Sequence, residues 1–172
     1  MIRDIVIYPD PRLRKVSKSV EDFDSKLHTL LDDMYETMIA SNGIGLAAVQ
    51  VGVLQRALII NLPREDEIQY KQDLYEIINP EITTKSEDCE LFSEGCLSVP
   101  EFFEDVSRAK EITLKYQDRD GNSHTLDADG MLSIALQHEI DHLNGKVFVD
   151  YLSFTKRKKF EKEWKKNLKK QK

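Results

Sequence analysis

Residues 137–145 read Gln-His-Glu-Ile-Asp-His-Leu-Asn-Gly, and this stretch decides the predicted fold. Apolar residues recur around it at helical spacing, which predicts a helix over residues 128–144 that ends with an Asn-Gly pair. His138 and His142 are four residues apart, so both imidazoles project from one face of that helix. Two neutral ring nitrogens in this position can share one metal ion, with Glu139 beside it as a candidate general acid or base.

The alternative interpretation is an amphipathic helix that carries two ordinary histidines. Both histidines lie on the apolar stripe of the helix, and the chain has only four histidines in all. Burying two imidazoles without partners is costly, whereas a shared ion would satisfy both. The spacing therefore favours a metal site.

A catalytic metal site needs a third protein ligand, and the residues alone leave its identity open. No histidine follows His142, and Phe148 stands where many metalloproteases have one. Cys96 is favoured because the glycine before it allows a close approach of the backbone. Cys89 lies between charged residues and is predicted to be a surface thiol. The full set of candidates is Cys96, Cys89, His124, Glu161 and Glu163.

A glycine-rich segment, Gly43-Ile44-Gly45-Leu46-Ala47-Ala48-Val49-Gln50, matches the G-x-G-x-x-A dinucleotide fingerprint. That fingerprint requires a strand before it and a helix after it. Here a helical pattern precedes the segment and no helix start follows, which argues against a phosphate site. We predict a turn that packs closely against another backbone and directs Gln50 into a site. A plain connecting loop is the alternative.

The remaining pattern predicts an α+β fold. Predicted strands cover residues 4–8, 57–61, 75–78, 111–117, 123–126 and 147–149, and further helices cover residues 21–41 and residues from Ser153 onward. The strands do not alternate regularly with helices. We therefore expect antiparallel sheets packed around a central metal-binding helix, with a C-terminal helix, in a single domain over residues 1–172.

Composition and charge narrow the class of protein. The chain has 172 residues, of which 40% are hydrophobic and 33% charged, as in a globular domain. It has neither a membrane-spanning stretch nor a secretory signal, and its two cysteines suit a reducing cytoplasm. Residues 155–172 carry ten lysines and arginines against two glutamates. This basic segment is either a solvated helix face or a contact surface for a polyanion.

Three motifs together resemble the peptide deformylase family. They are the loop at residues 43–50, the segment Glu94-Gly95-Cys96-Leu97-Ser98 and the helix at residues 137–145, and the similarity runs over about residues 3–165. The resemblance implies an α+β fold and removal of the N-formyl group from the formyl-methionine of new polypeptides, with release of formate. It implies Cys96, His138 and His142 as ligands of one divalent ion, usually Fe²⁺, which Zn²⁺, Ni²⁺ or Co²⁺ can replace.

The resemblance also implies roles around the ion. Glu139 would be the general acid and base, a water molecule on the metal would be the nucleophile, and the Gln50 side chain and the Leu97 backbone N–H would donate to the oxyanion. Gly45 would accept a hydrogen bond from the substrate backbone. Glu94 and Asp141 would support the ligands. The methionine pocket would be lined by Ile44, Phe92, Met131, Ile134 and Ala135.

The resemblance further implies that the basic segment contacts ribosomal RNA, as in some relatives, while neither a membrane nor DNA is an expected partner. Residues 101–103 read Glu-Phe-Phe, where many relatives have polar or basic residues near the pocket mouth. Substrate preference beyond the first residue is therefore open.

Two other classes of protein remain possible. One is a metallopeptidase that does not use Cys96, and the other is a non-catalytic metal-binding or ribosome-associated module. Intact Glu139 and Gln50 argue against the module, since a pure binder needs no general base.

Overall fold

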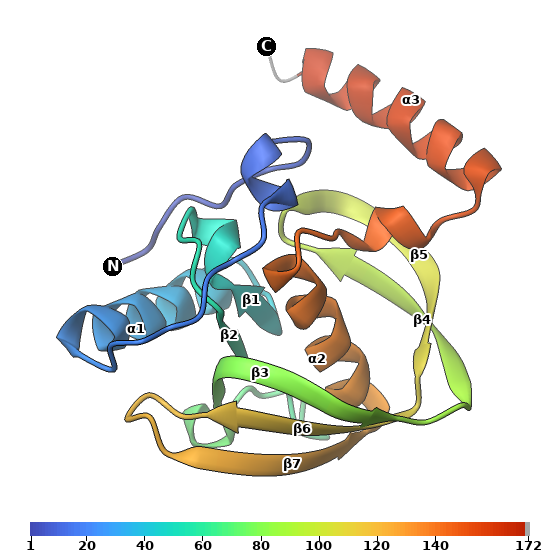
Figure 1. Ribbon diagram of the computed structural model, residues 1–172. Coiled ribbons are helices and arrows are strands. Elements are labelled where there is room, and N and C mark those ends of the chain that lie inside the picture. The colour runs from blue at the N-terminus through green and yellow to red at the C-terminus, as the bar shows by residue number, and fades with distance from the viewer. Residues whose placement is uncertain (171–172) are drawn as a thin grey trace.

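The computed structural model describes residues 1–170, in which three α-helices and seven strands form (Figure 1). The helices are α1 (Ser25–Ala40), α2 (Gly130–Leu143) and α3 (Phe154–Lys170). The strands are β1 (Gly45–Ala47), β2 (Ala57–Ile60), β3 (Tyr75–Lys85), β4 (Cys89–Cys96), β5 (Val99–Ala109), β6 (Glu111–Gln117) and β7 (Ser123–Asp129). Short 3-10 helices lie at Pro11–Arg14, Ala48–Val51, Lys71–Asp73 and Phe148–Tyr151. None of the helices in this part of the chain is both long and apolar enough to cross a bilayer.

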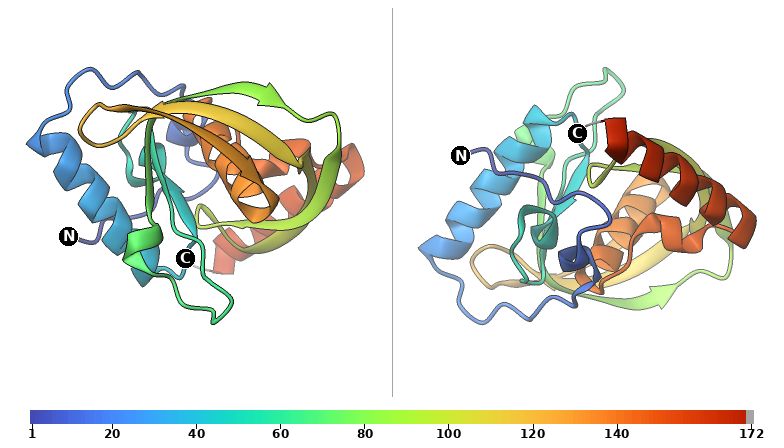
Figure 2. Two further views of the ribbon diagram at one scale, coloured as in Figure 1. Left: turned by 90° about the horizontal axis from the view of Figure 1, so that it is seen from below. Right: turned by 90° about the horizontal axis from the view of Figure 1, so that it is seen from above.

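The strands form two antiparallel sheets. One has five strands in the order β1-β2-β3-β6-β7, and the other is the β4–β5 hairpin. Figure 1 shows α2 between the β4–β5 hairpin and the larger sheet, and Figure 2 shows α1 and α3 on opposite sides of the molecule. The predicted α+β class, with antiparallel sheets and a C-terminal helix, is confirmed.

Helix α2 is buried on nearly every side. Leu136, Ile140 and Leu143 pack into the core against the large sheet. Its polar residues are buried as well, including His138 and Glu139. A helix buried all round has to find partners for its polar side chains inside the protein. This burial is what makes α2 the element around which a site can form.

Two predicted strands are wrong. Residues 4–8 form no strand, although Val6 N–H donates to the Gln50 carbonyl at 2.7 Å and Tyr8 N–H to the Ser98 carbonyl at 2.8 Å. Residues 147–149 lead into a 3-10 helix, in which Asp150 accepts a hydrogen bond from the Val147 N–H at 3.0 Å. Val6 of the first segment and Val147, Phe148 and Val149 of the second are buried in one cluster, so they need no strand pairing to be buried.

Other elements were missed or given different bounds. Strands β1, β4 and β5 were not predicted, β3 and β7 extend further than predicted, and α1 begins later. Most residues of the β4–β5 hairpin are exposed or only partly buried, and many of them are charged. The charged residues obscure the alternation of apolar and polar residues that would predict a strand. The α1 start is fixed by Asp24, whose carboxylate accepts the N–H groups of Lys26 and Leu27.

The basic C-terminal segment forms α3, while residues 171–172 lie outside the described part of the chain. Phe160 and Trp164 are one helical turn apart and both are buried. The Trp164 indole donates to the Tyr8 carbonyl at 3.0 Å, which joins α3 to the N-terminal segment. The lysines of α3 are exposed.

Candidate active site

Cys96 and the two histidines of α2 come together at the end of β4. One ligand atom from each lies within 4.8 Å of the other two, and the Cys96 Sγ is 3.3 Å from the His142 Nε2. The other candidates for third ligand lie elsewhere. Cys89 is exposed, His124 pairs with Asp118 at 2.7 Å, and the glutamates of α3 face solvent.

The three residues fit a metal ion by their chemistry. Burial lowers the pKa of His142 well below its usual value. Burial also opposes the charged form of His138, but the neighbouring Cys96 and Glu94 outweigh it and raise the pKa of His138 well above its usual value. Two imidazoles with ring centroids 5.1 Å apart cannot both be charged in such a place, and a cysteine sulfur binds a divalent ion as a thiolate. A shared divalent ion would meet all three demands.

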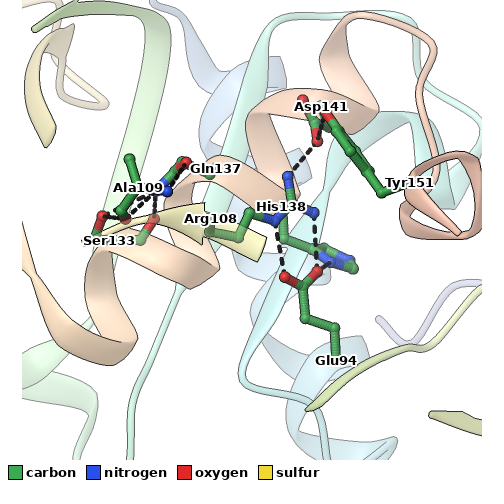
Figure 3. Close-up of polar contacts among 8 residues, drawn as sticks. All are labelled: Glu94, Arg108, Ala109, Ser133, Gln137, His138, Asp141 and Tyr151. Atoms are coloured by element: carbon green, nitrogen blue, oxygen red, sulfur yellow. Dashed lines mark hydrogen bonds and ion pairs between the residues drawn. The ribbon is translucent and has the colours of Figure 1, made fainter. Parts of the chain in front are cut away.

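Glu94 holds the ring of His138 in place (Figure 3). Its carboxylate accepts a hydrogen bond from the His138 Nδ1 at 2.8 Å, which leaves the other ring nitrogen free to face the ligand cluster. Arg108 donates to both oxygens of Glu94, at 2.8 and 2.9 Å. Burial alone would raise the pKa of Glu94, but Arg108 and His138 outweigh burial and hold that pKa below its usual value.

The same arginine also binds helix α2 directly, one turn beyond His138. Arg108 donates to the Asp141 carboxylate at 2.5 Å, and the Tyr151 hydroxyl donates to it at 2.8 Å. The guanidinium carbon of Arg108 lies 4.7 Å from the centre of the Tyr151 ring. One buried cation on β5 therefore joins Glu94 of β4 to Asp141 of α2, next to His138 (Figure 3).

A second network of hydrogen bonds fixes the position of α2 along β5. The Gln137 side chain accepts from the Ala109 N–H at 3.2 Å and donates to the Ala109 carbonyl at 2.9 Å, and the Ser133 hydroxyl donates to the same carbonyl at 3.0 Å (Figure 3). The residue next to Gln137 is His138. These hydrogen bonds therefore fix the position of His138 relative to β4.

Glu139 is buried without the partners that Glu94 has. It is 5% exposed, and within residues 1–170 its Oε2 has no hydrogen-bond partner. Its Oε1 lies against the backbone of β1, where a Cβ on Gly45 would approach it to 2.7 Å. Burial raises the pKa of Glu139 to about 7, although His138 pulls it down in part. A carboxyl group in this state can take and give a proton near neutral pH.

The glycine-rich segment forms β1 and a 3-10 helix, and it brings Gln50 under the site. The Gln50 Oε1 accepts from the Ala47 N–H at 2.9 Å, so its NH₂ group points the other way, 3.1 Å from the Ser98 Oγ and 3.5 Å from the Cys96 Sγ. No helix of more than one turn follows the glycines, in agreement with the argument against a phosphate site.

One cavity of about 470 Å³ opens onto these residues. All five residues predicted for the methionine pocket line it, together with much of the predicted catalytic set: Ile44, Phe92, Met131, Ile134, Ala135, Gly45, Cys96, Leu97, His138 and Glu139. Gln50 and His142, which are 1% and 0% exposed, do not reach its wall. The predicted site residues thus lie along the wall of this cavity or directly beneath it.

Sequence reasoning missed Arg108. The available signal was strand alternation, which puts Arg108 on the same face as Val106, and both are buried. A buried arginine requires an acidic partner. Because β5 was not predicted, this alternation could not be used to assign Arg108 to the buried face of a strand.

A buried glutamate lies beside two histidines and a thiol that could hold a metal ion, at the wall of an apolar cavity. This arrangement fits the class of hydrolases. Comparison with known proteins identifies the family within this class. The family model described as polypeptide deformylase matches residues 2–158. The chain belongs to the peptide deformylase family.

Individual relatives agree with the family model over nearly the whole chain. The chain is 57% identical to the peptide deformylase of Campylobacter jejuni, over 98% of this chain and 97% of that one. It is 58% identical to that of Helicobacter pylori strain P12, with the same coverage. The crystal structure of a peptide deformylase from Legionella pneumophila superposes with a TM-score of 0.89 at 43% identity, covering 100% of this chain and 99% of that one. The crystal structure of peptide deformylase from Ehrlichia chaffeensis superposes with a TM-score of 0.88 at 44% identity, covering 97% of each chain. An enzyme of this family removes N-formyl groups from nascent polypeptides.

Proposed function

We propose that this chain removes the formyl group from the formyl-methionine of new polypeptides by hydrolysis that depends on a divalent ion held by Cys96, His138 and His142. The observation that carries the proposal is a buried glutamate next to these three residues, in an apolar cavity of about 470 Å³. When bound, the ion acts as a Lewis acid and makes water a better nucleophile at neutral pH. Fe²⁺ is the proposed ion in the cell, with Zn²⁺, Ni²⁺ or Co²⁺ as replacements.

Glu139 moves the proton. It lies beside the proposed ligands with a carboxyl oxygen that has no partner among the described residues. As a base it takes a proton from the attacking water, and as an acid it delivers that proton to the departing amide nitrogen. Burial raises the pKa of Glu139 to about 7, which suits a group that both takes and gives a proton near neutral pH.

Gln50 and the Leu97 backbone N–H stabilise the oxyanion that forms on the formyl group. The amide of Gln50 is fixed by its hydrogen bond from Ala47, so its NH₂ group is oriented before the substrate arrives. Donors that need no reorganisation contribute about 3 kcal/mol each to such a transition state.

The substrate backbone adds to the sheet edge that Gly45 provides. Strand β1 is at the edge of the five-stranded sheet, and an edge strand can pair with an extended peptide. The methionine side chain then enters the apolar part of the cavity, between Ile44, the residue before β1, and Met131 and Ile134 on α2.

The direct test is formate release from formyl-Met-Ala-Ser by protein purified without oxygen, against a Glu139→Ala control. No formate above that control would exclude the proposal. Cys96→Ser separates it from the metallopeptidase alternative, because it should remove both metal and activity from a deformylase and neither from a peptidase.

We further propose that α3 contacts ribosomal RNA. Its buried face, Phe160 and Trp164, packs on the body of the protein, which leaves its exposed lysines free to meet phosphates. Pelleting with ribosomes at rising salt tests this, with and without residues 155–172. Equal pelleting of both forms would contradict it.

A further inference from the structure

The mouth of the active-site cavity is bordered by an irregular turn of the β4–β5 hairpin. Gly95 pairs with Phe103, but the next residue, Cys96, pairs with Val99, so residues 100–102 bulge out of the ladder. Pro100, Glu101 and Phe103 all line the cavity. The bulge therefore adds side chains at the cavity wall beyond those predicted to bind methionine.

Phe103 presents an aromatic surface at this mouth. It is 67% exposed, yet its ring lies close against the backbone of the opposite strand, where a Cβ on Gly95 would come within 2.3 Å of it. Glycine is the residue that permits this contact. The ring is thus held one residue away from the proposed ligand Cys96, while much of it faces outward.

Glu101 brings an uncompensated negative charge to the same place. The acidic residues that line the cavity are Glu94, Glu101 and Glu139, and no lysine or arginine of residues 1–170 lines it. Glu94 is neutralised by Arg108, and Glu139 belongs to the reaction. The Glu101 side chain forms no ion pair or hydrogen bond within residues 1–170, and the residue has a positive φ of 63°. A glutamate rarely adopts this conformation, and such strain is typical of functional positions.

We propose that Glu101 and Phe103 form a specificity subsite for a lysine or arginine at the second or third residue of the formylated polypeptide. The aliphatic part of the basic side chain lies on the Phe103 ring, and its charged end reaches the Glu101 carboxylate. An acidic side chain in the same position is repelled. This subsite rests on the proposed deformylase function and assigns it a preferred class of substrate.

The test compares two pairs of peptides that differ only in one charged residue. The first pair is formyl-Met-Lys-Ser and formyl-Met-Glu-Ser, and the second is formyl-Met-Ala-Lys-Ser and formyl-Met-Ala-Glu-Ser. In at least one pair we expect kcat/KM for the lysine peptide to be about fivefold higher at low salt, the scale of one exposed ion pair, and the ratio to shrink as salt rises.

Variants assign the preference to the two residues. Glu101→Gln should bring the lysine-to-glutamate ratio close to one, whereas Glu81→Gln, which removes an exposed charge from the other sheet, should leave the ratio unchanged. Phe103→Ala should lower kcat/KM by about threefold for both a lysine and an uncharged norleucine peptide, since both lose the same apolar contact. Thermal melting of each variant verifies folding.

The outcomes separate this proposal from the one it rests on. Formate released from every peptide at equal rates, or a lysine preference that survives in Glu101→Gln, overturns the subsite and leaves the deformylase function standing. No formate from any peptide overturns the deformylase function itself.

Discussion

The two buried glutamates on either side of His138 have opposite surroundings. Glu94, on the β4–β5 side, accepts hydrogen bonds from Arg108 and His138, and its pKa is held below the usual value. Glu139, on the β1 side, has an oxygen with no partner among the described residues and a pKa raised to about 7. Both are about 5% exposed or less, so burial alone does not separate them.

The difference lies in the neighbours. A buried carboxylate with a full set of donors is fixed in charge and position, and it can only orient something else. A buried carboxyl that lacks donors is poised to change its protonation state. Glu94 and Arg108, on the β4–β5 side of the site, therefore hold other residues in position, and we call them the frame. Glu139, on the β1 side, is the reactive group. Substitutions on either side of the site should remove one part of this contrast.

The largest effect is expected from Glu139→Gln. It preserves the shape of the side chain and removes the proton carrier, so kcat should fall by a factor of about 10² to 10⁴. Metal content should stay the same because Glu139 is not a proposed ligand. Stability at neutral pH should not fall, because no hydrogen bond to the Oε2 is lost and a carboxyl whose pKa is raised by burial opposes folding above its unfolded pKa. A large loss of stability would place Glu139 in the frame instead.

Arg108→Leu should do the reverse and damage the fold. It leaves the carboxylates of Glu94 and Asp141 buried without their cation, which costs about 3–5 kcal/mol in the free energy of unfolding. Urea denaturation measures this loss. Adding Glu94→Gln and Asp141→Asn to the arginine variant should recover part of it, because the buried charges are then gone. No recovery would mean that the arginine acts through packing alone.

The sequence predicted the reactive half of the site better than the frame. His138, Glu139 and His142 lie within one helical turn, so local spacing was enough to group them. Cys96 is 42 positions before the first histidine, and only the family resemblance, together with its glycine neighbour, selected it over Cys89 and His124.

The frame depends on contacts between residues far apart in the chain. Arg108 meets Asp141 across 33 positions and Glu94 across the hairpin. Contacts over such sequence separations leave no local pattern in the sequence. The β4–β5 hairpin was not predicted either, because its charged residues obscure the alternation of apolar and polar residues. The strands predicted at residues 4–8 and 147–149 failed for a related reason, because an apolar run signals burial without saying whether a ladder or packing provides it.

Glu94→Gln tests whether the frame serves the metal. An amide holds the His138 ring less firmly, so affinity for the ion should fall by about 10- to 100-fold, as measured by competition with a chelator. The matched control is Glu90→Gln, an exposed position on the same strand. Unchanged affinity in Glu94→Gln would limit Glu94 to a structural role.

The same variant should change how stability depends on pH. The folded protein holds the pKa of Glu94 below its unfolded value, so the stabilisation is present above the unfolded pKa, near 4.3, and is lost as the pH falls through the folded one. Glu94→Gln should therefore show a shallower loss of stability than the wild type in acid. An equally steep loss in both proteins would contradict the assigned direction.

Gly45→Ala is expected to have the smallest effect, and it tests the position of the reactive group. The new methyl group would lie 2.7 Å from the Glu139 Oε1, so the carboxyl has to move, and a displacement of this size lowers kcat by roughly tenfold. Gly43→Ala is the companion variant in the same segment. Its methyl group meets the end of the Leu97 side chain, which can rotate away, so the loss should be smaller. If both variants lost activity equally, the cause would be the glycine segment as a whole, and the close contact between Gly45 and Glu139 would carry no special weight.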